Sequence, residues 1–248
     1  MRIAEILVAA FSFSILLFGG AAVGQSTKSG TDFRIDIDIY DDEKKPPISS
    51  IQTMFAAGQY IELDDAESRV TVVDPGKNRI TVLDSNRKTL VHLDMTLIES
   101  QLNSALSQMT EEQRRMFSSD GGPLSEGDSF VAIGNERFRY KIRAMTPSNP
   151  HVAVSYGDFA NWSARLNAMF YKPYTPPLIR MQVNELLIDQ RQLPAELRRF
   201  TTTRGKTEEI VARLMLKESL SDKDRTRVAT VFESMNKFKP TTDKEFFR

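Results

Sequence analysis

A short phrase of apolar residues closed by an aspartate recurs every ten positions in this chain, and it restricts the fold more than any other feature. The three copies end at Asp74, Asp84 and Asp94. Residues that favour turns (Pro, Gly, Ser and Asn) follow the first two copies. One strand and one turn together account for about ten residues. The repeat therefore predicts an antiparallel meander over residues 70–94.

Both faces of these expected strands carry aliphatic side chains. Val70 and Val72 lie on one set of alternate positions, and Val73 and Leu83 lie on the other. A sheet with one face in water would alternate apolar and polar residues more cleanly. Burying one aliphatic side chain is worth ~1.5–3 kcal/mol. Both faces are therefore expected to be covered, one by helices and the other by more protein or by an apolar ligand.

Other segments show the two-residue period of strands or the three- and four-residue steps of helices. The expected strands are 33–40, two strands within 48–63 broken near Ala57-Gly58, and a hairpin of 129–133 with 138–145. The expected helices are 97–109, 157–170, 178–193 (ended by Pro194) and a final helix capped by Ser221. Residues 196–203 and 206–217 remain open between helix and strand.

Two sequence patterns predict how the helix after the meander begins and is interrupted. Thr96 and Glu99 have the spacing of a capping box, in which the first and fourth residues bond each other's backbone N–H groups. Thr110 and Gln113 repeat that spacing. We therefore expect a helix start at Thr96 and a break and restart at Thr110.

The N-terminus has the order of a secretory signal peptide. Arg2 precedes an apolar run from Ile6 to Phe18, which small residues follow up to Gly24. This order predicts export with cleavage after Gly24, so residues 1–24 are a signal peptide and residues 25–31 a disordered leader. An uncleaved membrane anchor is the alternative, because the apolar run can be extended to Val23. The rest of the chain contains no apolar run of spanning length.

Composition excludes several classes of function. Lys+Arg and Asp+Glu both number 33, so the basic excess of a typical nucleic-acid binder is missing. With no cysteine, the chain has no thiol catalysis, no zinc–thiolate site and no disulfide. Neither a phosphate-binding glycine loop nor a Gly-x-Ser-x-Gly elbow is present.

The residues that most often carry chemistry are few and poorly spaced. His92 lies in an expected strand, and His151 lies in a loop seven positions before Asp158. The acidic run 36–43 lacks the glycine and terminal glutamate of a loop-type calcium site, so a solvated strand face is the better interpretation. Phe159 and Trp162 fall on a helical stripe that is more typical of a core than of a ligand pocket.

Four phrases occur in a fixed order along the chain: VTVVDPGKNRITVLD, FANWSARLNAMF, PPLIRMQVNELLIDQRQLPAELRRF and LSDKDRTRVATVFESMNKFKP. Together they resemble a family of exported, functionally uncharacterised bacterial proteins found mainly in planctomycete-type genomes. The resemblance brings no activity with it, but it implies that 206–217 is a strand running back along 196–203. More distantly, the order of elements is similar to the half-open barrel of periplasmic lipoprotein carriers.

The sequence therefore predicts one α+β domain over residues 32–240, followed by a polar tail over 241–248. Its expected architecture is a curved, half-barrel-like antiparallel β-meander packed with several amphipathic helices. The expected role is a periplasmic or extracellular carrier or binding module for an apolar, lipid-like ligand. The alternative is a structural or interaction protein of the cell envelope that holds no ligand. No catalytic, cofactor-binding or metal-ligating residue is predicted, and a hydrolase assembled from distant residues ranks last.

Overall fold

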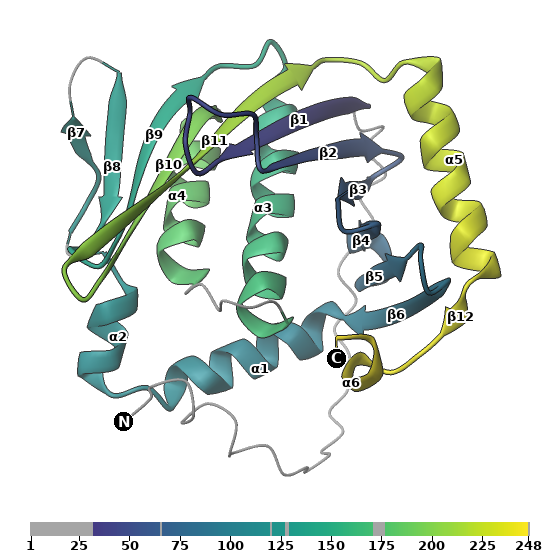
Figure 1. The fold of residues 1–248 in the computed structure, drawn as a ribbon, viewed down its shortest axis with the longest axis horizontal. Helices are drawn as coiled ribbons and strands as arrows, with labels where there is room; N and C mark the ends of the chain where they lie inside the picture. The colour runs from purple at the N-terminus through teal and green to yellow at the C-terminus, as the bar shows by residue number, and fades with distance from the viewer. Residues whose placement is uncertain (1–31, 65, 120, 127–128, 171–176, 248) are drawn as a thin grey trace.

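The computed structural model of the chain describes residues 32–64, 66–119, 121–126, 129–170 and 177–247. These residues form an α+β fold in which one twelve-stranded, mostly antiparallel sheet curves around helices without closing into a barrel (Figure 1). The predicted fold class is confirmed. The expected signal peptide and leader, residues 1–31, lie outside the described residues.

The strands follow one another across the sheet in an order close to their order in the chain. That order is β12-β6-β5-β4-β3-β2-β1-β11-β10-β9-β8-β7. The strands are β1 (Phe33–Tyr40), β2 (Ser49–Ala56), β3 (Gln59–Asp64), β4 (Arg69–Asp74), β5 (Arg79–Asp84), β6 (Thr89–Asp94), β7 (Leu124–Glu126), β8 (Phe130–Gly134), β9 (Phe138–Met145), β10 (Leu193–Thr203), β11 (Lys206–Lys217) and β12 (Lys239–Pro240). The helices are α1 (Met95–Ser107), α2 (Glu111–Phe117), α3 (Pro150–Phe170), α4 (Pro177–Asp189), α5 (Asp222–Lys237) and α6 (Asp243–Phe246).

The ten-residue repeat is a meander of β4, β5 and β6, as predicted. Each closing aspartate binds the backbone of the segment that follows. Asp74 accepts a hydrogen bond from the Lys77 N–H (3.1 Å), and Asp84 accepts one from the Arg87 N–H (2.8 Å). The third, Asp94, accepts one from the Leu97 N–H (2.9 Å) and caps α1.

The predicted capping box at Thr96 and Glu99 is therefore wrong. Asp94 has the extended backbone of an N-cap, and its carboxylate takes the donor that the start of α1 offers. Thr96 lies in the first turn, where its hydroxyl accepts from Asn78 Nδ2 at 2.8 Å. The second predicted box is confirmed, because Thr110 and Gln113 bond each other at the start of α2.

Both faces of the meander are covered by helices of the chain itself. On the concave face, which we call the helix side, Val73 and Ile80 belong to the apolar cluster of α1, α3 and α6. On the convex face, Val72 and Leu83 pack in the cluster of α5. Figure 1 shows α3 and α4 under the arch of the sheet and α5 outside it. The prediction that neither face is left wet is confirmed. The expected grouping of Val73 with Leu83 is wrong, because the register of β4 with β5 puts these two residues on opposite faces.

The two segments that the sequence left open form the hairpin of β10 and β11, as the family resemblance implied. The preceding helix, expected to reach Leu193, ends at Asp189 instead. Leu193 begins β10, and Pro194 sits in that strand beside an irregularity in its register. Proline is tolerated at such an irregularity because it cannot donate to the regular ladder.

Helix α3 begins at Pro150, seven residues before the expected start, and buries Val152 and Ala153 in its first turn and a half. Its Gly157 faces α4 at close range. A Cβ at this position would lie 2.3 Å from Ile188 Cγ1, so the glycine lets the two helices approach.

Residues 239–247, which we call the C-terminal clip, include the edge strand β12, pair with β6 and end in α6. Phe246 is only 3% exposed and belongs to the core cluster of the helix side. Arg87 Nη2 donates to the Phe246 carbonyl at 2.7 Å, and the rings of Phe170 and Phe247 stack at 4.5 Å. Its polar composition hid these core contacts from the sequence analysis, which placed 241–248 outside the domain.

The two edges of the sheet are both short. β12 contributes two residues at one edge and β7 three at the other, where Leu124 is 69% exposed.

Candidate functional site

The two histidines occupy ordinary positions. His92 lies on the convex face, where its Nδ1 is 2.9 Å from the Thr81 hydroxyl. Burial, and then the charge of Arg79, lower the pKa of His92. His151 is exposed in the first turn of α3, and its backbone N–H donates to Asn149 Oδ1 at 3.0 Å. Among the residues that the structure describes, no group of three or more His, Asp or Glu side chains is placed to hold a metal ion.

The acidic run 36–43 is divided among separate partners. Asp36 pairs with Arg34 at 2.9 Å, and Asp38 accepts a hydrogen bond from Ser50 Oγ at 2.6 Å. Glu43 reaches across the sheet to Arg198 on β10 at 2.8 Å. The run is therefore a set of structural contacts on the convex face, and its carboxylates do not converge on one point.

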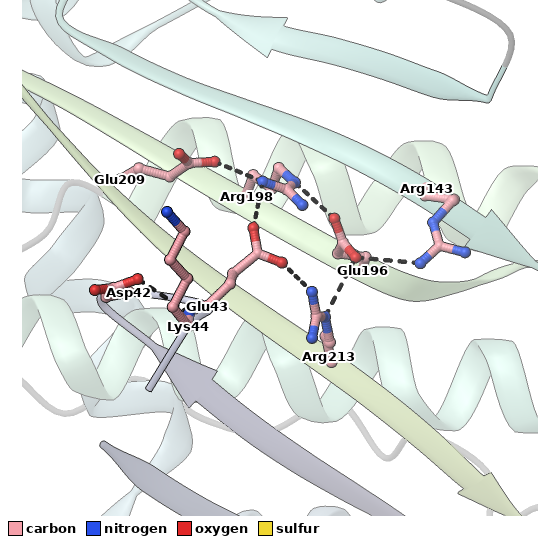
Figure 2. A network of polar contacts seen from close by, with 8 residues as sticks. All are labelled: Asp42, Glu43, Lys44, Arg143, Glu196, Arg198, Glu209 and Arg213. Atoms are coloured by element: carbon pink, nitrogen blue, oxygen red, sulfur yellow. Dashed lines mark hydrogen bonds and ion pairs between the residues drawn. The ribbon is translucent and has the colours of Figure 1, made fainter. Parts of the chain in front are cut away.

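Glu43 belongs to a network of arginines and glutamates that Figure 2 shows on the convex side of β9, β10 and β11. At its centre the Glu196 carboxylate, 5% exposed, contacts Arg198 Nε (2.6 Å) and Arg143 Nη2 (3.1 Å). Arg213 Nε lies 3.5 Å from the same carboxylate. Burial alone would raise the pKa of Glu196, but the hydrogen bonds from Arg198 and Arg143 outweigh it and lower the pKa. Each charge in the network has a partner, so the network joins strands and leaves no free ligand group.

A different set of polar side chains lies on the helix side. We call it the interior polar row, and its members are Glu62 (β3), Tyr156 (α3), Arg180 (α4), Tyr140 (β9) and Arg199 (β10). Arg180 Nη2 lies 3.4 Å from the Tyr156 hydroxyl. The charge of Glu62 acts to raise the pKa of Tyr156. The charges of Arg180 and Arg199 act to lower the pKa of Tyr140. Each member of the row therefore interacts electrostatically with at least one other member.

Strand register places the row on the helix side. Residues opposite each other on neighbouring antiparallel strands point to the same face. Glu62 lies between Thr53 of β2 and Thr71 of β4, both buried. Arg199 lies opposite Tyr140, which packs with Ile179 and Val183 of α4 in an apolar cluster. The polar groups are thus set among apolar walls from both the sheet and the helices.

Burial raises the pKa of three members of the row. It raises the pKa of Glu62 to about 7, with a further upward effect from Asp64 and an opposing one from Arg69. Burial also raises the pKa of Tyr140 and Tyr156, so both hydroxyls stay protonated and able to donate near neutral pH.

Three polar atoms near the row lack partners. Arg180 Nη1, Arg199 Nε and Thr53 Oγ1 are buried and have no hydrogen-bond partner within the described part of the chain. Native interiors pair most buried polar atoms, because an unpaired one costs roughly 1–3 kcal/mol. Unpartnered polar atoms also lie on the convex face, at Arg34, Gln59 and Arg79, but on the helix side they occur on two arginines that have no acidic partner within the described residues.

The sequence analysis missed the interior polar row. Its members come from five separate elements. The pairing of β9 with β10 and the packing of α4 on β9 bring Tyr140, Arg199 and Arg180 together, and the contact of Arg180 with α3 adds Tyr156. No local sequence pattern marks the row, because the burial of Ile179 beside Arg180 on α4 is known only from the structure. The aromatic stripe is core as expected, because Phe159 is buried and stacks edge-on to Phe55 at 5.8 Å.

A pocket of about 530 Å³ lies on the surface beside α2 and the β8–β9 turn. It is lined by Glu111, Glu112, Arg115, Met116, Asn135, Glu136 and Arg137. The amide of Asn135 donates to the carbonyls of Met116 (3.1 Å) and Ser118 (2.7 Å) at the end of α2, so its polar group is already used by the fold.

The part of the chain that the structure describes includes no helix of sufficient length and apolarity to cross a membrane. Comparison with known proteins adds no function, since no family model matches the chain and no curated protein is similar to it.

Proposed function

We propose that this protein is an exported carrier or binding module that holds an apolar, lipid-like ligand between the helix side of its sheet and helices α3 and α4. The observation that carries the proposal is the interior polar row with its unpartnered atoms, set among apolar walls. Small-molecule sites commonly combine mostly apolar walls with a few convergent polar groups.

The open sheet supports this role. Because the strands do not close into a barrel, helices rather than further strands bound the interior on its lower side (Figure 1). In this proposal the α3–α4 pair moves away from β9 and β10 to admit the ligand. The predicted signal peptide, residues 1–24, would place the carrier in the periplasm or outside the cell.

The test is recovery of a bound molecule. The full chain is expressed in bacteria, and the exported protein is purified from membrane extracts without detergent. Native mass spectrometry is expected to show a bound apolar compound that organic solvent removes, and the emptied protein is expected to take up the neutral dye Nile red. Met215→Ser, on the convex face, is the matched control and should bind as the wild type does. A clean unliganded mass together with no dye uptake would overturn the proposal.

The second candidate is a structural or interaction protein of the cell envelope. It is favoured by the finding that α5 and the α1–α3–α6 cluster already cover both faces of the meander. In-cell cross-linking separates the two candidates, because an envelope component would yield a specific protein adduct in cells whose purified protein carries no lipid.

A further inference from the structure

We infer that the ligand carries an acidic head group, which binds between Arg180 of α4 and Arg199 of β10. This inference rests on the proposed function and names the chemical class of its ligand. Both guanidinium groups lie on the helix side, and each has a buried nitrogen without a partner. Neither has an acidic partner within the described residues; Arg180 has the Tyr156 hydroxyl at 3.4 Å.

The neighbouring residue on β10 gives a contrast. Arg198 precedes Arg199 on β10 but points to the convex face, where Glu43, Glu196 and Glu209 lie 2.6–3.0 Å from its guanidinium (Figure 2). One strand thus carries a fully paired arginine outward and an unpaired arginine inward. Arg199 is half-buried, and its buried Nε has no partner within the described residues, so it is able to bind an anion.

The two inward arginines both lie near Tyr140. Arg199 is the cross-strand neighbour of Tyr140, and α4 packs on Tyr140 through Ile179, one residue before Arg180. The charges of both arginines act to lower the pKa of the buried Tyr140 hydroxyl, although the larger effect of burial raises it. The Tyr140 and Tyr156 hydroxyls are additional donors, so four side chains from four elements can surround one anion.

The chemistry of these four side chains indicates which ligand head group they bind. Guanidinium groups bind carboxylate and phosphate in paired hydrogen bonds, and neutral tyrosine hydroxyls donate to the same oxygens. Glu62, at the far end of the row, would repel an anion when ionised, which places the head at the arginine end. The apolar cluster of β8, β9, β10 and α4 adjoins that end, and an alkyl chain would insert among its side chains when α4 moves away from the sheet. The ligand class is therefore an anionic amphiphile.

Isothermal titration calorimetry with three twelve-carbon probes tests the inference below their micelle concentrations: dodecanoate, dodecyl phosphate and 1-dodecanol. The emptied full-length protein is expected to bind an anionic probe about tenfold or more tighter than dodecanol, because charged hydrogen bonds contribute ~1.5–3 kcal/mol. The stronger of the two anionic probes identifies whether the head is a carboxylate or a phosphate.

Variants assign the effect to the arginines. Arg180→Met and Arg199→Met are each expected to weaken the anionic probe about tenfold and to leave dodecanol within about twofold. Lys217→Met, which removes an exposed cation from the convex face, should change neither affinity. Arg180→Lys and Arg199→Lys, which keep the charge but lose the paired geometry, replace any methionine variant that does not fold and are expected to bind the anionic probe with intermediate affinity.

The experiment separates a failure of the acidic head group from a failure of the carrier proposal. If the anions and dodecanol bind equally, or if the arginine variants bind the anions as the wild type does, the acidic head group is refuted and the carrier proposal stands. If none of the three probes binds and Nile red is not taken up, the carrier proposal falls with it.

Discussion

Two glutamates, Glu196 buried and Glu62 half-buried, show how partners decide the charge state of one residue type. Glu196 lies under three arginines, and its pKa is lowered. Glu62 faces the helix side with no hydrogen bond within the described chain, and burial raises its pKa to about 7. The folded protein therefore holds Glu196 ionised, whereas Glu62, with a pKa of about 7, changes charge near neutral pH.

The raised pKa of Glu62 predicts a pH-dependent stability difference. A raised carboxyl pKa stabilises the fold below the unfolded value near 4.5, and this contribution is lost as the pH rises through about 7. Glu62→Gln stays neutral, so it should gain stability relative to the wild type between pH 4.5 and pH 8, by up to ~3 kcal/mol. Urea unfolding at both pH values measures the change. Glu112→Gln, on exposed α2, is the control, and a Glu62→Gln difference that does not vary with pH would refute the assignment.

At the scale of elements, the packing of α3 against α4 depends on Gly157. Alanine favours a helix over glycine by about 1 kcal/mol, yet its Cβ would meet Ile188 at 2.3 Å. We expect Gly157→Ala to lower the free energy of unfolding by ~1–3 kcal/mol in urea titrations.

A second substitution identifies the cause of that loss. In an Ile188→Ala background the clashing atoms are gone, so adding Gly157→Ala should be neutral or stabilising. Gly121→Ala has no atom within 4 Å of its new Cβ and controls for a general effect of the substitution. Equal losses in both Ile188 backgrounds would show that the close approach of the helices is not responsible.

How far the sequence predicts each element depends on the range of the interactions that define it. The β4–β6 meander, the Thr110 capping box and the Ser221 capping box with Asp224 follow from local patterns, and the structure has all three. The start of α3 at Pro150 and the strand at Leu193 are set by burial against distant parts of the chain. The interior polar row depends entirely on such tertiary packing, so no spacing in the sequence reveals it.

At the scale of the whole molecule, the C-terminal clip ties the end of the chain to the core. Phe246→Ala should lower the free energy of unfolding by ~3 kcal/mol or more, because it empties a buried aromatic site. Hydrogen exchange should accelerate first in β6, whose Leu90 carbonyl accepts from the Thr241 N–H at 2.8 Å.

Leu97→Ala on α1 is the matched control for Phe246→Ala. Its side chain is 55% exposed, so the free energy of unfolding should change by less than ~0.5 kcal/mol. Equal effects of the two substitutions would show that the clip is not anchored in the core.

The short outermost strands β12 and β7 bear on how copies of this protein meet in a crowded compartment. A long flat outer strand is a template for fibril growth, since each unpaired N–H and C=O group can bond an incoming chain. The two residues of β12 and the three residues of β7 offer an incoming chain few such groups. A sheet this wide is thereby protected against polymerising through its own backbone.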